Sequence, residues 1–147
     1  PMKNGKDFES STEYFRWLLT AETEGGAEVL SRDFSMFVIW PNKPAGDLEA
    51  FDADTNDWSV VTEVSETTKA GTPFLISANL NEQYLRDWEG FEELTLAYVN
   101  KGAHVLPHED DAVVVSRSGG GGYVLMGDEM RWSVLNPHRD IQRILVP

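Results

Sequence analysis

The chain has no cysteine among its 147 residues. This absence excludes a disulfide framework and a thiolate nucleophile. It also excludes a zinc site built on sulfur, which leaves histidine and carboxylate side chains as the protein ligands for a metal. The composition is compatible with a reducing compartment, and we expect a cytoplasmic location and no bound cofactor.

Long apolar runs are absent as well. The longest, residues 36–40, has the length of a strand, whereas a helix that spans a bilayer needs roughly 20 apolar residues. Lys3 and Lys6 are not followed by the apolar core of a signal peptide. We therefore expect no membrane insertion and no export by a standard signal.

Basic residues are few. Twelve Lys and Arg stand against 25 Asp and Glu, so the formal net charge is −13. A surface of this charge repels nucleic-acid phosphates and anionic membranes, and we expect direct binding to neither. It attracts a basic protein partner and accelerates the encounter. The plain alternative is that the acidity serves solubility alone.

What the chain does contain is enough apolar material for a core: 41% of its residues are hydrophobic and 11% aromatic. A chain of this length buries about two thirds of its unfolded surface and needs neither a disulfide nor a structural metal to fold. We predict a single acidic α+β domain over residues 1–147.

Local patterns predict the order of the elements. Ser10 and Glu13 fit a capping box before a helix that Gly25 and Gly26 would end. A second helix is predicted to begin at Asn81 and to end at Gly90. Strands are predicted at 35–40, 72–80, 93–100, 112–117, 122–126 and 131–135, with a hairpin over 48–64. Residues 140–146 fit either a helical turn or an edge strand.

Short connections between strands favour antiparallel pairing. The predicted fold is therefore α+β with two layers: a mostly antiparallel sheet of about six to seven strands, and two helices packed on one face. The glycines at 119–122 are predicted to form a hairpin tip, because strand rather than helix follows them and a phosphate-binding loop requires a helix there.

Residues 52–63 carry carboxylate or amide oxygens at loop positions 1, 3 and 5 and a glutamate at position 12. This spacing resembles the calcium loop of an EF-hand. Position 6, which favours glycine, is Asp57, and Pro44 and Gly46 lie where the entering helix would be. We interpret the segment as a turn between Phe51 and Trp58, with calcium binding as the alternative.

A second polar segment, residues 104–111, holds two histidines and three carboxylates. His104, His108 and Glu109 could ligate a divalent metal, and one of the histidines could act as a general base. His138 is distant in sequence. The plain interpretation is a solvated acidic loop.

The leading functional hypothesis is an acidic protein-binding module, such as an inhibitor, immunity protein or antitoxin, that masks a basic surface of a partner. Exposed acids and one aromatic residue would carry the contact: Asp47, Glu49, Asp52, Asp54, Asp57, Trp58, Glu109, Asp110 and Asp111. One alternative is a small metal-dependent hydrolase that uses His104 and His108. Another is a phage- or secretion-associated structural or chaperone-like homodimer. No catalytic motif favours an enzyme.

Overall fold

The computed structural model describes residues 8–20, 34–39, 42–64, 68–80, 99–101, 104–106, 112–117, 120–138, 141 and 143–147. Its helical elements are α1 (Ser11–Thr20), η1 (Phe34–Phe37), η2 (Ala53–Thr55), η3 (Gly127–Glu129) and α4 (Trp132–Leu135). Its strands are β1 (Trp58–Val61), β2 (Pro73–Ser77), β3 (Val99–Lys101), β4 (His104–Leu106), β5 (Ala112–Arg117), β6 (Gly122–Met126) and β7 (Ile144–Leu145). No helix among these segments has the length and apolarity to cross a membrane.

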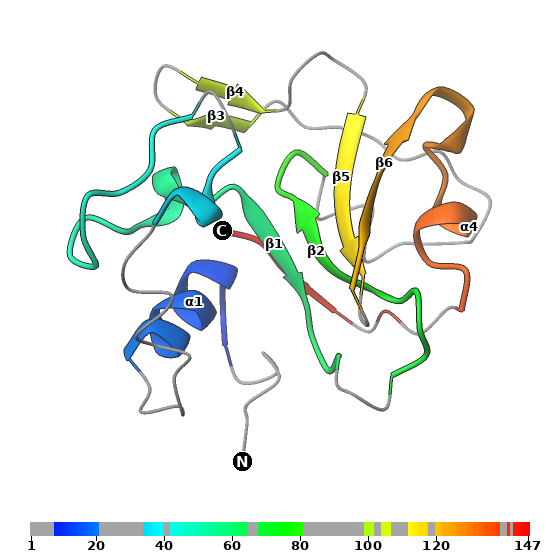
Figure 1. The fold of residues 1–147 in the computed structure, drawn as a ribbon, viewed down its shortest axis with the longest axis horizontal. Helices are drawn as coiled ribbons and strands as arrows, with labels where there is room; N and C mark the ends of the chain where they lie inside the picture. The colour runs from blue at the N-terminus through cyan, green and yellow to red at the C-terminus, as the bar shows by residue number, and fades with distance from the viewer. Residues whose placement is uncertain are drawn as a thin grey trace.

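The architecture is α+β and is built on an open antiparallel sheet. Five strands follow the order β6-β5-β2-β1-β7, and every neighbouring pair runs antiparallel. The β3–β4 hairpin forms a separate two-stranded sheet at the top of Figure 1. Among the described residues the main sheet has five strands, and the predicted six to seven are not confirmed, because β3 and β4 pair with each other and not with this sheet.

The main sheet is apolar on both faces. In β1, Val60 belongs to a buried cluster with residues of α1 and η1, whereas its neighbour Val61 belongs to a second cluster with residues of α4. Leu145 and Ile144 of β7 divide in the same way. Successive side chains of a strand point to opposite faces. The helices α1 and α4 therefore contribute to cores on opposite sides of the sheet. The predicted packing of two helices on one face is not tested, because the second predicted helix, residues 81–90, lies outside the described residues.

The predicted start of α1 is confirmed, and one detail of its cap differs. The Glu13 amide donates to Ser10 Oγ at 3.1 Å. The Glu13 carboxylate, however, accepts from the Glu9 amide at 2.9 Å, one residue earlier than a capping box requires. Tyr14, Phe15 and Leu19 of α1 are buried in the first cluster. The predicted stop at 25–26 lies outside the described residues.

Two predicted strands are helical turns. Residues 34–37 form η1, in which Phe34 and Phe37 are both buried. Residues 132–135 form α4, in which Trp132 and Leu135 are buried while Val134 is exposed. In each turn the buried residues are three apart, which is a helical spacing and not the alternation of a strand. In an apolar run this short, the sequence does not distinguish the helical period from the alternation of a strand.

The remaining strand predictions are confirmed in part. Those at 72–80, 112–117 and 122–126 correspond to β2, β5 and β6. The tail forms an edge strand, β7, and the predicted 48–64 hairpin keeps only its second strand, β1, which pairs with β2 and β7. The second helix and residues 93–98 lie outside the described part of the chain. β5 and β6 pair as a hairpin, and Gly120 and Gly121, the described residues between them, are at positive φ.

Candidate functional site

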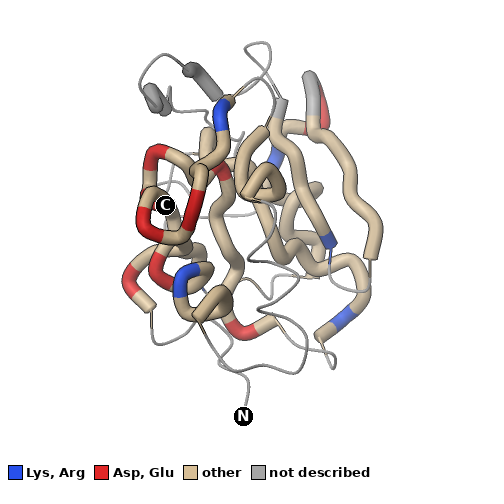
Figure 2. Tube along the Cα trace, turned by 60° about the vertical axis from the view of Figure 1, so that its left-hand side comes forward, with Lys and Arg blue, Asp and Glu red and all other residues tan. Residues whose placement is uncertain are grey.

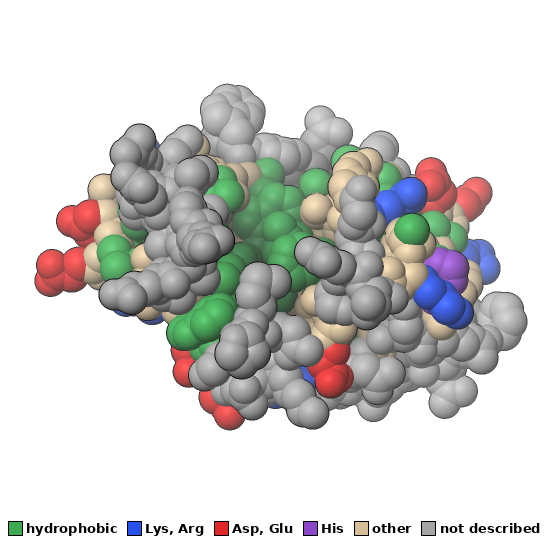
Figure 3. Space-filling view, turned by 60° about the horizontal axis from the view of Figure 1, so that its bottom comes forward, with side chains coloured by type: hydrophobic (Ala, Val, Ile, Leu, Met, Phe, Trp, Pro, Cys, Tyr) green, Lys and Arg blue, Asp and Glu red, His purple; other side chains and the backbone are tan. Residues whose placement is uncertain are grey.

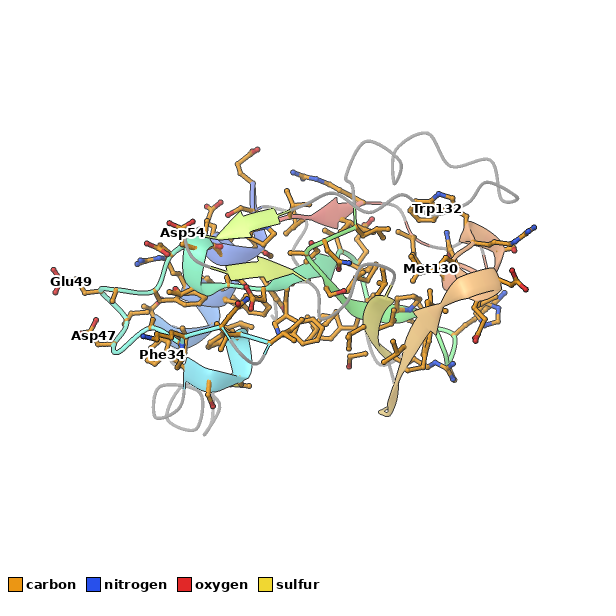
Figure 4. All side chains as sticks on the ribbon, turned by 90° about the horizontal axis from the view of Figure 1, so that it is seen from above. Phe34, Asp47, Glu49, Asp54, Met130 and Trp132 are labelled. Carbon is orange, nitrogen blue, oxygen red and sulfur yellow. The ribbon has the colours of Figure 1, made fainter. Side chains whose placement is uncertain are left out.

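The most acidic feature of the described surface is a loop over residues 42–57, which we call the acidic loop. Four of its carboxylates are exposed, those of Asp47, Glu49, Asp52 and Asp54, against one exposed lysine, Lys43. In Figure 4 the labelled side chains of Asp47, Glu49 and Asp54 lie at one end of the molecule and point away from the sheet. Figure 2 shows acidic positions gathered around the C-terminal end of the chain.

The two ends of the acidic loop are joined by a buried carboxylate. Asn42 Nδ2 donates to Asp57 Oδ2 at 2.7 Å, and the Ile39 amide donates to the same oxygen at 2.8 Å. The Asp57 amide donates to the Phe37 carbonyl at 2.8 Å. Asp57 has no exposed surface. We call this junction of Phe37, Ile39, Asn42 and Asp57 the closed neck. Hydrogen bonds to an ionised acceptor are stronger than those between neutral groups, so the closed neck holds the loop to η1.

A second set of hydrogen bonds ties the loop to α1. Asn56, which is fully buried, donates through Nδ2 to Ser11 Oγ and Thr12 Oγ1, each at 3.0 Å. Its Oδ1 accepts from the Trp58 amide at 3.1 Å, and Ser11 Oγ donates to the Trp58 carbonyl at 2.6 Å. The first turn of α1 is therefore fixed against the point where the acidic loop enters β1.

An apolar interior supports the loop from within. Phe51 is fully buried, and its ring centroid lies 4.8 Å from that of Phe37 and 5.9 Å from that of Phe34. Ala45 is buried as well. The Arg16 guanidinium of α1 donates to the Phe51 carbonyl. A compact surface loop with close ends and its own packed side chains has the form of an Ω-loop, a type that is often functional.

Short turns within the loop set the direction of its acids. Asp52 Oδ1 accepts from the amides of Asp54 and Thr55 and so caps η2. Asp47 Oδ1 accepts from the Ala50 amide at 2.8 Å. These are the local hydrogen bonds by which aspartate favours turns. One oxygen of each carboxylate orients the backbone, and the side chain remains exposed to solvent.

The structure changes the role of two residues in the predicted contact set. Asp57 is buried in the neck, so it cannot meet a partner and instead shapes the loop. Trp58 is half-buried and packs against the cluster that contains α1, so its indole is not the exposed ring that the sequence suggested. Asp47, Glu49, Asp52 and Asp54 remain at the surface.

The EF-hand spacing does not bring its oxygens together. Asp52 at position 1 turns toward its own backbone, and Asn56 at position 5 is buried, with its Oδ1 accepting from the Trp58 amide. Within the described segments, no three metal-ligating side chains form a cluster that could hold an ion. Residues 107–111 and the side chain of His104 lie outside the description. His138 is exposed, with Nε2 3.3 Å from the Ala70 carbonyl oxygen.

Sequence reasoning missed Asn42 and Asn56. Both are asparagines beside turn-forming residues, and their composition indicates exposed turn positions. Nothing local distinguishes a buried asparagine from an exposed one, because the partners of Asn56 lie 44 and 45 residues away. A comparison of the chain with known protein families, characterised proteins and solved structures found no match, so any role must be argued from the acidic loop itself.

Proposed function

We propose that the chain is an acidic binding module whose acidic loop docks on a basic surface of a protein partner and masks it, in the manner of an inhibitor or immunity protein. The observation that carries the proposal is the combination of four exposed carboxylates with the closed neck beneath them. A loop fixed before binding loses little conformational freedom on association, so more of the interaction energy appears as affinity.

The charge distribution supports the same function. Acidic side chains stand at the left-hand end of the molecule in Figure 3, whereas basic side chains gather mainly at the right-hand end, among other acids. A net charge of −13 guides a basic partner toward the molecule, and the acidic end offers the contact. Such pairs accelerate association and weaken as salt screens them.

The test compares two neutralised variants against a partner purified after affinity capture. The loop variant, D47N/E49Q/D54N, removes three charges but keeps an acceptor oxygen at each position, including the one that Asp47 presents to Ala50. The control, E9Q/E63Q, neutralises two exposed acids that lie outside both the acidic loop and the β6 edge. Three lost contacts at about 0.3–1 kcal/mol each predict an affinity loss of about 5- to 150-fold.

We expect the loop variant to lose affinity mainly through a slower association rate, with a weaker dependence on salt, while the control keeps the wild-type affinity. Equal affinities of wild type and loop variant across salt concentrations would contradict the proposal. Recovery of a partner without a basic surface would contradict it too.

A further inference from the structure

The strand β6 forms one edge of the main sheet. Within the described residues it pairs only with β5, and Figure 1 shows it at the margin of the sheet, away from β7. The other edge, β7, has two residues, and both are buried. By contrast, β6 has five residues, none of them charged and none of them proline. Short length, charge and proline are the features that keep natural edge strands from pairing with other chains, and β6 has none of them.

We propose that β6 pairs in an antiparallel sense with β6 of a second copy of this chain, about a two-fold axis beside Val124. Val124 is 46% exposed, one of the few large apolar side chains at the described surface. In this register Val124 faces its own equivalent, and Tyr123 faces Leu125 of the second copy. Cross-strand pairs of β-branched residues favour such an arrangement, and a two-fold axis makes the contact self-complementary.

Charge at the two ends of β6 favours the antiparallel orientation and a second copy of this chain as the occupant. At one end, the Arg117 guanidinium of β5 lies over the Tyr123 ring of β6, 4.1 Å from its centroid, which places a base at the start of β6. At the other end, the exposed acids Asp128 and Glu129 precede a single exposed base, Arg131. An antiparallel pair places the basic end of each copy beside the acidic end of the other. A parallel pair would align like charges.

A single-cysteine variant tests the register directly, because the chain has no cysteine of its own. Directly opposed residues of an antiparallel pair have Cα atoms about 4.5–5.5 Å apart, which lies within the span of a disulfide. We expect V124C to form a disulfide-linked dimer under mild oxidation. The matched control is V134C, at an apolar residue of α4 that is 39% exposed. If V134C crosslinks as readily as V124C, the proposed register is wrong.

The mass in solution provides the second test. We expect wild-type protein at micromolar concentrations to sediment with about twice the chain mass of 16.5 kDa. V124K places like charges opposite each other and is expected to weaken the dimer at least tenfold, whereas V134K leaves it intact. R117E should weaken the dimer too, because it places acids at both ends of β6. R117E/D128K/E129K, which exchanges the charges of the two ends, should restore the dimer. A monomeric wild type, or a V124K variant that dimerises normally, overturns the proposal whether or not the acidic loop binds a basic partner.

Discussion

The buried carboxylate of Asp57 offers the sharpest test of the closed neck. Replacement by alanine removes the acceptor of two hydrogen bonds, from the Ile39 amide at 2.8 Å and from Asn42 Nδ2 at 2.7 Å. Each bond to a charged acceptor contributes about 1.5–3 kcal/mol, and the Asn42 donor remains buried when the acceptor is lost. We expect Asp57→Ala to lower the free energy of unfolding by about 3–5 kcal/mol, a large part of the 5–15 kcal/mol typical of a domain.

Urea unfolding followed by tryptophan fluorescence measures this loss, since Trp58 follows Asp57 directly and is half-buried. Asp57→Asn retains one acceptor oxygen and should lose about half as much. Asp54→Ala is the control, because Asp54 lies in the same loop with an exposed side chain, and its unfolding should match that of wild type. A loss below about 1 kcal/mol for Asp57→Ala would refute the idea that this carboxylate holds the neck, since a single hydrogen bond of this kind exceeds that value.

Three further changes test other parts of the fold. Asn56→Ala should lower the free energy of unfolding by about 2–4 kcal/mol in the same assay, because it breaks three hydrogen bonds between neutral groups, two of them buried. A loss below about 1 kcal/mol would show that the tie to α1 is weak. Gly122→Ala should cost about 1–3 kcal/mol, because its Cβ would lie 2.8 Å from the Val115 carbonyl oxygen, whereas Gly46→Ala meets nothing within 4 Å and should be neutral. Burial raises the pKa of the Tyr14 phenol above its ordinary value of 10.0. The contribution of this phenol to the free energy of unfolding is therefore complete below pH 10.0 and is lost as the pH rises through the folded pKa. Tyr14→Phe should reduce the slope of this alkaline loss of stability, measured by urea unfolding at several pH values.

The elements that could be predicted are those whose signals are local. The Ser10–Glu13 pattern marks the start of α1 because the hydroxyl and the amide that it joins are three residues apart. The strands β5 and β6 could be predicted because continuous apolar runs flank a glycine tip, and the tip requires positive φ at Gly120 and Gly121. In these cases the pattern that predicts the element lies within its own segment, even though distant contacts, such as those of Asn56 with α1 and of β2 with β5, add to its stability.

The errors arose where distant contacts decide the structure. Residues 34–37 form a turn and not a strand because Phe37 packs against Phe15 at 5.0 Å and against Phe51 at 4.8 Å, and a helical spacing places Phe34 in the same cluster. Asp57 was assigned to the surface for a similar reason. A carboxylate in a run of turn-forming residues is usually exposed, and only the approach of Ile39 and Asn42 makes its burial favourable.

The acidic loop and β6 lie in different parts of the sheet, and this separation connects the two proposals. The loop leads into β1, next to the edge strand β7, while β6 is the opposite edge. A two-fold pairing through β6 therefore extends the sheet away from both acidic loops and leaves each of them open to solvent. The dimer would present two equivalent acidic sites at its outer ends, so a partner with two basic surfaces would gain avidity, while one with a single surface would bind each copy independently. Because V124K separates the copies without changing the acidic loop, the affinity for a single-surface partner should be the same in the monomeric variant as in the dimer.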